Sequence, residues 1–576
     1  MSFDNAMRFS RFECEAQVSI LSNRRTRLRE VLQLSRVIRR MNSIMKKSFP
    51  VFPLMYCLFP VLSLYESNIE ELELQYILAP VVAVLMGMTI CWVASGLIIH
   101  DAAKSGLLVS FSLFWFFSYG HIETFLQQAA KHSALLANPF VMYTMWILVF
   151  EVGIWLVLRY GNRLTADYTM LTIMAIALIA LPVFKIVSGQ FERLRGETRL
   201  PIVDTHSMSA AKVELPDIYY IVLDGYARAD TLKGIYKMDN TPFLSYLRTN
   251  GFQIADRATS NYCQTMLSLS SSLNMDYVDS LLNHKLRPDS QDRYPLSLLI
   301  RNNRAFDIAR KMGYTTVAFG NDYELSNAKG ADIFIKSKKS MSSFNSLLLS
   351  LTPVEVLTKP DSSISGYENH RAGVLSILKR LPSIVQGKKP TFVFAHILVP
   401  HPPFVFGRDG KPCYASRRYG LNDGSHFRAI GGTTAEYRIG YRDQVMFVNG
   451  RIEQVITQIL AKAKRPTVII LQGDHGPSCT LDFEKPKVTG IKERSRILCA
   501  VRVPRETKIV IPSDITPVNV LRTVFGYYFD RSLRPLENRT YYSTWSRPYD
   551  FTDVTSVAKG VGISVNWANI FSTSSP

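Results

Sequence analysis

The stretch that decides the fold is PDIYYIVLDGYARAD, residues 216–230. From Ile218 to Leu223 it is a run of β-branched, aromatic and aliphatic side chains, which is typical of a buried strand. The run stops at Asp224-Gly225, a dipeptide that by itself indicates only a turn. In open α/β sheets, however, ligands bind beyond the carboxyl ends of the strands. Asp224 is therefore expected at the edge of the sheet where the chemistry is done.

Further strands and helices alternate downstream of this stretch. Strands are expected at 252–258, 315–320, 390–400, 466–476 and 495–504. Helices are expected at 241–251, 266–275, 295–314, 341–358, 366–385, 433–465 and 516–529. Strands that alternate with helices predict an α/β sandwich.

The apolar residues are concentrated at the other end of the 576-residue chain. Hydrophobic residues make up 47% of the composition and charged residues 20%, which is apolar for a purely soluble protein. Before about residue 190 there are five runs that approach the ~20 residues needed to cross a bilayer. They are 48–65, 76–99, 105–122, 140–158 and 166–187. Five consecutive runs of this length favour a bundle of about five transmembrane helices over core helices of a soluble protein.

Charged residues beside these runs predict the orientation in the membrane. Residues 24–47, which precede the first run, contain many bases and the single acid Glu30. Positive segments next to a span stay on the cytoplasmic side, so the N-terminus is expected inside. The loop after the first run carries four acids and no base, which suits the outside: Glu66, Glu70, Glu71 and Glu73. Five crossings from an inside start place the chain outside after about residue 188.

These features divide the chain into parts with different roles. The predicted parts are a basic cytoplasmic segment (1–47), transmembrane helices (48–187), a polar tether (188–215), an external catalytic domain (216–530) and a C-terminal extension (531–576). The topology accounts for part of the net charge of +20. Nucleic acid is not an expected partner, because no external stretch interleaves clustered bases with aromatic residues. An oxidising compartment permits disulfides but no pairing is specified, and free thiols are equally open, for Cys263, Cys413, Cys479 and Cys499.

Polar residues whose side chains can act in catalysis or bind a metal occur at the ends of the expected strands. They are Asp224, the pair His396 and His401, and Asp474-His475, together with Thr265 at the start of a helix. Each has a simpler explanation: Thr265 as a helix N-cap, Asp474-His475-Gly476 as a turn, and the histidines as polar residues around a rigid PHPPF corner. Their joint occurrence at element ends of one α/β unit indicates a site.

Together these residues make a coherent metal site. Two carboxylates and an imidazole bind a divalent cation such as zinc and leave a position for a fourth ligand. A hydroxyl in that position, from Thr265, becomes a nucleophile at neutral pH. The helix start adds backbone N–H groups that stabilise charge on a phosphoryl oxygen. His396 and His401 are then expected to donate protons to a leaving oxygen or to bind phosphate.

The external part, roughly residues 216–530, resembles the alkaline phosphatase/sulfatase superfamily. Within it, the layout is similar to the membrane-bound branch of lipoteichoic acid synthases and phosphoethanolamine or phosphoglycerol transferases. The matching motifs are VLDG at Asp224, NYCQTMLSLSSS with Thr265, HILVPHPPF with His396 and His401, and QGDHGP with Asp474 and His475. The resemblance implies an α/β/α sandwich of alkaline phosphatase type behind a five-helix membrane part. It also implies that Asp224, Thr265, Asp474 and His475 are metal ligands, and that Thr265 becomes phosphorylated.

Departures from the family pattern narrow the expected activity. Sulfatases of this superfamily need a C-x-P-x-R frame, and here Cys263 is followed by QTML, which disfavours sulfate-ester hydrolysis. The related transferases usually have Glu at the first metal position, where this chain has Asp224. One tightly held ion is expected, zinc, with manganese or magnesium as alternatives. Arg228 is a candidate for binding donor or acceptor, with a surface ion pair to Asp230 as the alternative.

The resulting hypothesis is a multi-pass enzyme of the bacterial inner membrane with a periplasmic catalytic domain. It moves a phosphoryl-linked group, such as phosphoethanolamine or phosphoglycerol, from a membrane phospholipid to an envelope glycan or lipid through Thr265. A tether to the membrane raises the effective concentration of a lipid donor. The alternatives are a phosphodiesterase or phosphatase with the same site, and a non-catalytic membrane protein that keeps the fold.

Overall fold

The structure, a computed structural model, describes most of the chain. The described residues are 50–70, 72–129, 139–165, 168–195, 214–282, 287–336, 343–354, 365–384, 387–415, 417, 419–529 and 532–560. The predicted cytoplasmic segment, 1–47, and most of the predicted tether lie outside them. The chain forms two compact units: Met1–Ser63 with Ala79–Lys185, and Leu64–Leu78 with Ile186–Pro576.

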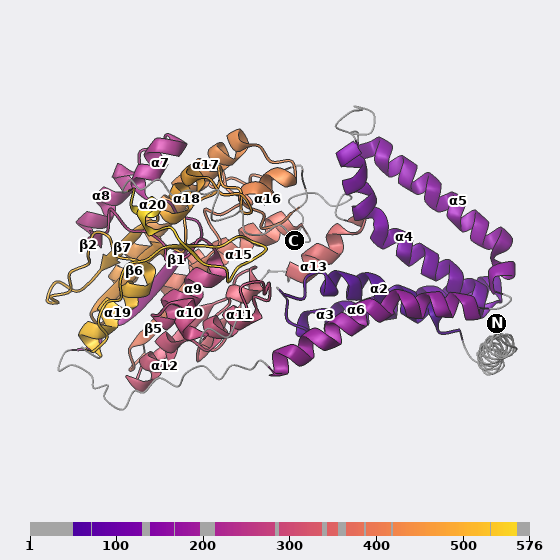
Figure 1. The fold of residues 1–576 in the computed structure, drawn as a ribbon, viewed down its shortest axis with the longest axis horizontal. Helices are drawn as coiled ribbons and strands as arrows, with labels where there is room; N and C mark the ends of the chain where they lie inside the picture. Colours follow the sequence, from indigo (N-terminus) through magenta and orange to yellow (C-terminus); the bar gives the residue numbers. More distant parts are fainter. Residues whose placement is uncertain are drawn as a thin grey trace, which may run out of the picture. The chain divides into compact units, whose positions relative to one another are not determined.

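All five predicted apolar runs are helical (Figure 1). The helices are α2 (Phe52–Glu66), α3 (Gln75–Ile99), α4 (Ala102–Ala129), α5 (Pro139–Thr165) and α6 (Thr169–Arg195). The last four are long and apolar enough to cross a membrane, whereas α2 has only 15 residues. Large apolar side chains on these helices are exposed, among them Leu97 at 72% and Ile98 at 79%. Such surfaces are expected where a helix contacts lipid rather than water.

The second unit is built on one seven-stranded sheet with the order β2-β7-β6-β1-β5-β3-β4. The strands are β1 (Asp217–Leu223), β2 (Phe252–Ile254), β3 (Thr315–Phe319), β4 (Ile333–Ile335), β5 (Thr391–Ile397), β6 (Thr467–Gly473) and β7 (Cys499–Arg502). Strands β6, β1, β5, β3 and β4 are parallel, while β7 is antiparallel to both β6 and β2. Every residue of β1, β5 and β6 is buried, as expected for parallel strands covered on both faces.

Two hydrophobic cores lie on opposite faces of this sheet. Alternate residues of β1 point to different cores: Ile218, Tyr220 and Val222 join one, and Tyr219, Ile221 and Leu223 join the other. The first core is completed by α9 (Thr265–Asn274), α11 (Tyr294–Arg301), α12 (Arg304–Lys311) and α19 (Pro517–Tyr528). The second is completed by α7 (Ala229–Tyr236), α8 (Thr241–Thr249), α15 (Gly366–Arg380) and α17 (Thr434–Lys462). The predicted α/β/α sandwich is confirmed.

Shorter elements complete the unit. They are α10 (Val278–Leu281), α13 (Ser343–Ser350), α16 (Gly424–Ala429), α18 (Val488–Ser495), α20 (Thr555–Lys559), β8 (Tyr541–Tyr542), β9 (Thr552–Asp553) and the 3₁₀ turns η2 (Glu324–Ser326) and η3 (Leu381–Ser383). The part predicted as a C-terminal extension packs onto the α/β unit, since Tyr542 and Val554 share a buried cluster with Leu481. The cysteines among the described residues are free thiols.

Two element boundaries differ from the sequence prediction. Helix α6 continues to Arg195, into the stretch predicted as a tether. The single helix predicted at 295–314 is two helices, α11 and α12, which break at Asn302-Asn303. The physical reason is the buried side chain of Asn303, whose Oδ1 accepts a hydrogen bond from Phe306 N at 2.9 Å and starts a new helix.

We predict that Asn303→Ala lowers the free energy of unfolding by about 1–2 kcal/mol, because it removes this cap and the hydrogen bond from Nδ2 to Ile300 O at 2.8 Å. Thermal unfolding of the intact protein in detergent checks this. Asn302→Ala is the matched control, because Asn302 is the exposed neighbour. Equal melting temperatures for the two variants would contradict the assignment.

Candidate active site

The sheet topology brings most of the predicted site residues to one edge. Strand β1 lies between β5 and β6, and all three are parallel, so their carboxyl ends are adjacent. Asp224 follows β1, and Asp474 and His475 follow β6. His396 is the penultimate residue of strand β5, and His401 lies in the connection after this strand. Helix α9 begins at Thr265, so Thr265 is its first residue and the N-cap is Gln264.

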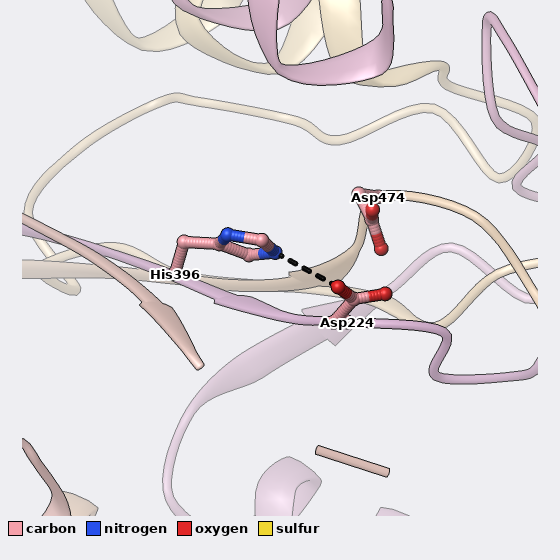
Figure 2. A group of neighbouring side chains, drawn as sticks. All are labelled: Asp224, His396 and Asp474. Atoms are coloured by element: carbon pink, nitrogen blue, oxygen red, sulfur yellow. Dashed lines mark ion pairs between the residues drawn. The ribbon is translucent and has the colours of Figure 1, made fainter. Parts of the chain in front are cut away.

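Asp224, His396 and Asp474 form a compact buried group (Figure 2). One ligand atom from each lies within 4.8 Å of the others, and His396 Nε2 is 3.3 Å from Asp224 Oδ2. Three atoms here are buried without a hydrogen-bond partner: Asp224 Oδ1, Asp474 Oδ2 and His396 Nε2. Unpaired buried polar atoms are costly unless something satisfies them. Two carboxylates and an imidazole with free lone pairs fit a divalent cation.

Hydrogen bonds behind this group hold its side chains in place. Gly225 N donates to Asp474 Oδ1 at 3.0 Å, which fixes the carboxylate and leaves Oδ2 free. Gly225 adopts φ +73°, a left-handed conformation that glycine takes without strain. His396 Nδ1 lies 3.0 Å from Ser326 Oγ. When Nδ1–H donates to this hydroxyl, the lone pair on Nε2 faces the carboxylates, as in metal-binding histidines.

His475 lies on the other side of the two carboxylates, beside Thr265. Its Nε2 is 3.2 Å from Asp474 Oδ2, 3.6 Å from Asp224 Oδ1 and 2.9 Å from Thr265 Oγ1. Its Nδ1 lies 3.0 Å from Gly476 O, an acceptor that favours a proton on Nδ1. Nε2 is then the unprotonated nitrogen, an acceptor that the Thr265 hydroxyl shares with Arg494 Nη2, which is also 2.9 Å away. This arrangement is that of a hydroxyl nucleophile with a basic partner.

Electrostatics set the charge states of these groups. Burial and the neighbouring Arg494 lower the pKa of His475 to about 4, against the opposing effect of Asp474 and Asp224. The imidazole is therefore neutral at neutral pH, the form that accepts a proton or binds a metal. Burial alone would raise the pKa of Asp224, but the imidazoles around it, His401 foremost, hold it below its usual value.

The first turn of α9 supplies backbone N–H groups at the same place. Gln264 makes no side-chain cap; its amide instead donates to Ser543 and Thr544 O. The N–H groups that begin a helix have no partner within it, and they favour an anion. Cys263 is buried in a hydrophobic cluster with Leu481 and Phe483. The threonine, rather than the cysteine, is therefore the residue of this motif that contacts the buried imidazole.

Asp423 and Arg494 belong to the site but were missed by the sequence analysis. Arg494 donates to Asp423 Oδ2 at 2.5 Å and from Nη2 toward His475 Nε2 at 2.9 Å. Asp423 Oδ2 is 3.5 Å from His401 Nε2. Although burial alone would raise it, Arg494 and His401 hold the pKa of Asp423 at about 2. Asp423 is the N-cap residue of α16 and Arg494 lies in the last turn of α18, neither within a recognisable motif, and the only signal is the NDG turn before α16.

A cavity of about 490 Å³ opens beside these residues. From the site it is lined by Asp224, Thr265, His401, Asp423 and Arg494. Its size is that of a site for a small organic ligand rather than for an ion alone. Phe483, His426 and Trp545 form an aromatic part of the wall.

Two predicted site residues lie elsewhere than expected. His396 is completely buried and is not part of the cavity wall, so it does not reach a leaving oxygen there. Arg228 also lies away from the cavity: its guanidinium bonds both oxygens of Asp230, at 2.8 and 2.7 Å, and Ala258 O. The ion pair that the sequence analysis left open as an alternative is the one present. His401, by contrast, lies on the cavity wall.

A family model described as Sulfatase matches residues 216–527. No curated protein sequence matches the chain. Among solved structures, the C-terminal periplasmic domain of EptC from Escherichia coli, in complex with zinc, is 11% identical with a TM-score of 0.41 and covers 60% of this chain and 95% of its own. The integral membrane lipooligosaccharide phosphoethanolamine transferase A from Neisseria meningitidis is 16% identical, with a TM-score of 0.38, and the match covers 83% of this chain and 95% of that one. An alkaline phosphatase superfamily protein from Vibrio parahaemolyticus is 13% identical, with a TM-score of 0.34, and the match covers 64% of this chain and 82% of that one.

We predict that a divalent cation stabilises the folded protein through the Asp224–His396–Asp474 group. A ligand present at about 100 times its Kd stabilises by roughly 2.7 kcal/mol, so removal by EDTA should lower the melting temperature by several degrees. In Asp474→Asn, EDTA should have little effect, and the metal content of the purified protein should fall. Asp289→Asn, at an exposed carboxylate, is the control. A wild-type melting temperature indifferent to EDTA and added zinc would contradict the prediction.

Proposed function

The chain belongs to the sulfatase family, and we propose that this sulfatase-like enzyme transfers a phosphoryl-linked group from a membrane phospholipid through a covalent intermediate on Thr265. The observation that carries the proposal is the 2.9 Å contact between Thr265 Oγ1 and His475 Nε2, with Thr265 lining a cavity. A hydroxyl paired with a neutral imidazole is equipped to attack phosphorus, and sulfate chemistry would require the absent C-x-P-x-R frame.

In the first half-reaction, Thr265 Oγ1 attacks the phosphorus of the donor phosphodiester and gives its proton to His475 Nε2. The bond from phosphorus to the oxygen of the lipid alcohol breaks, and that oxygen takes a proton from His401. In the second half-reaction, the hydroxyl of the acceptor attacks the phosphorus and its proton passes to His401. Thr265 leaves and recovers its proton from His475, which restores the starting state.

His401 is the proton donor best placed for the leaving alcohol. Its Nδ1 donates to Pro402 O at 2.5 Å, and its Nε2 faces Asp423 Oδ2 at 3.5 Å. Because Asp423 is itself held by Arg494 and by Tyr437 OH at 2.6 Å, the ring has a fixed orientation toward the cavity.

Asp224, His396 and Asp474 would hold one divalent cation, with zinc the first choice because of the imidazole ligand. Such an ion supplies positive charge where the phosphoryl oxygens gain negative charge. His475 and Thr265, predicted as ligands, border the same carboxylates. His396 therefore takes a ligand role in this proposal in place of the predicted proton donation. Arg494 contributes a second, permanent positive charge beside the nucleophile.

The donor is proposed to be a phospholipid, with phosphoethanolamine or phosphoglycerol as the transferred group and an envelope glycan or lipid as the acceptor. The four membrane-capable helices support a lipid donor, because the catalytic unit is joined to them by the chain. One solved structure with a similar fold is described as a phosphoethanolamine transferase. The proposed location is the bacterial inner membrane, with a cytoplasmic N-terminus and a periplasmic catalytic unit.

We predict that the intact protein, incubated with headgroup-labelled phospholipid, acquires a phosphodiester-linked adduct on Thr265. Peptide mass spectrometry should locate the adduct there in the wild type and find none in Thr265→Ala. Thr265→Ser, which keeps the hydroxyl, should retain part of the labelling. Labelling that persists in Thr265→Ala would refute the proposal. An adduct that is released only to water, with no acceptor product, would identify a hydrolase.

We further predict that His401→Gln slows transfer from a phospholipid by about 10²–10⁴-fold, the usual contribution of a general acid. For release of p-nitrophenolate from a p-nitrophenyl phosphodiester, measured as kcat/KM, the loss should be much smaller, because this step needs no proton for the leaving group and precedes attack by the acceptor. Rates for the two substrates, measured on the same preparations, separate this role from damage to the site. Equal losses on both substrates would exclude His401 as the proton donor.

A further inference from the structure

The segment between α2 and α3 is part of the catalytic unit rather than of the membrane unit. Residues Leu64–Leu78 fall within the same compact unit as the α/β sandwich, although they join two apolar helices. Glu70 O accepts a hydrogen bond from Arg293 N at 3.2 Å, just before α11. We call the described residues of this stretch, 64–70 and 72–78, the α2–α3 segment.

Glu73 is the main anchor of the α2–α3 segment. It is 8% exposed, and its Oε1 is 2.5 Å from Arg301 Nη2 and 3.3 Å from Lys329 Nζ. Arg301 ends α11, and Lys329 follows η2. One largely buried carboxylate thus bonds two bases of the sandwich. Removing one partner of such a buried ion pair strongly destabilises the contact between the elements that carry it, because an uncompensated charge is left behind.

Arg193, near the end of α6, is a second and independent anchor. Its guanidinium donates to the backbone carbonyls of Leu72, at 3.1 Å, and Ile69. The same group pairs with Asp292 at 3.1 Å and lies over the ring of Tyr294, 4.5 Å from its centroid. The end of α6 therefore holds the α2–α3 segment against the catalytic unit.

The anchored segment reaches the catalytic cavity. Ser67, Asn68, Glu70 and Leu72 line it together with Asp224 and Thr265. The segment is short, and each end continues directly into an apolar helix. If α2 and α3 end at the membrane surface, so few residues keep the segment at the level of the lipid headgroups.

We propose that the α2–α3 segment is the donor-side wall of the cavity, which receives the phosphodiester headgroup of a lipid that remains in the bilayer. This inference rests on the proposed function. It adds that the α2–α3 segment gives the enzyme its preference for donors that stay in the membrane. Glu73 and Arg193 act as positioning residues: they hold the wall in place and have no contact with the reacting atoms. A small water-soluble phosphodiester approaches Thr265 without needing this wall.

The test compares two donors on full-length protein reconstituted in vesicles. The donors are phosphatidylethanolamine in the vesicle and bis(p-nitrophenyl) phosphate in solution. In Glu73→Ala we expect kcat/KM for the lipid, divided by kcat/KM for the soluble ester, to fall at least about tenfold. Arg193→Gln should lower the same ratio through the separate anchor. Glu537→Ala, which removes an exposed ion pair with Arg539, should leave the ratio unchanged.

Bound zinc and the melting temperature are measured on each variant, so a collapsed site is recognised. If Glu73→Ala fails to fold, Arg193→Gln decides the question alone. A ratio that stays at the wild-type value in folded variants, whether both rates fall together or neither changes, would overturn the proposal. A wild-type protein that turns over the soluble ester but not the lipid would overturn it as well. Inactivity of the wild type on both donors would instead refute the proposed function, and this inference with it.

Discussion

The structure depends on the close approach of two buried carboxylates. Asp224 and Asp474 end neighbouring parallel strands, β1 and β6, so the backbone register of the sheet forces them together. Two negative charges in a low-dielectric interior repel each other unless a positive charge compensates them. Arg494 supplies one positive charge beside them, and the proposed cation would supply another. The same concentration of positive charge is what a phosphoryl group needs when it is attacked.

The residues around the carboxylates divide the work by their position. His396 is completely buried at the carboxyl end of β5 and faces the carboxylates, whereas His401 lies on the cavity wall beside Asp423. His475 stands between the carboxylates and Thr265. Three imidazoles from the ends of β5 and β6, the strands on either side of β1, thus have three different environments. In the proposed mechanism these surroundings, rather than the chemical type of the side chain, separate ion binding, proton donation and activation of the nucleophile.

The cavity is also bordered by a stretch of chain that joins two apolar helices. Its wall includes residues from the α2–α3 segment, which is fixed to the sandwich by Glu73 and Arg193. A soluble phosphatase would have no use for a wall that is continuous with apolar helices. A lipid-dependent transferase gains from it, because the donor headgroup and the nucleophile then meet without extracting the lipid.

The sequence by itself determined the local features, namely the apolar helices and the strands, and it predicted a site from Asp224, Thr265, His401, Asp474 and His475, which the structure places close together. These follow from periodicity, composition and position at the ends of strands, all of which act over a few neighbouring residues. Only the tertiary structure decided that His396 faces the carboxylates, and that Asp423, Arg494 and the α2–α3 segment join the site. Such contacts depend on which distant elements pack together, and no local pattern in the chain records that.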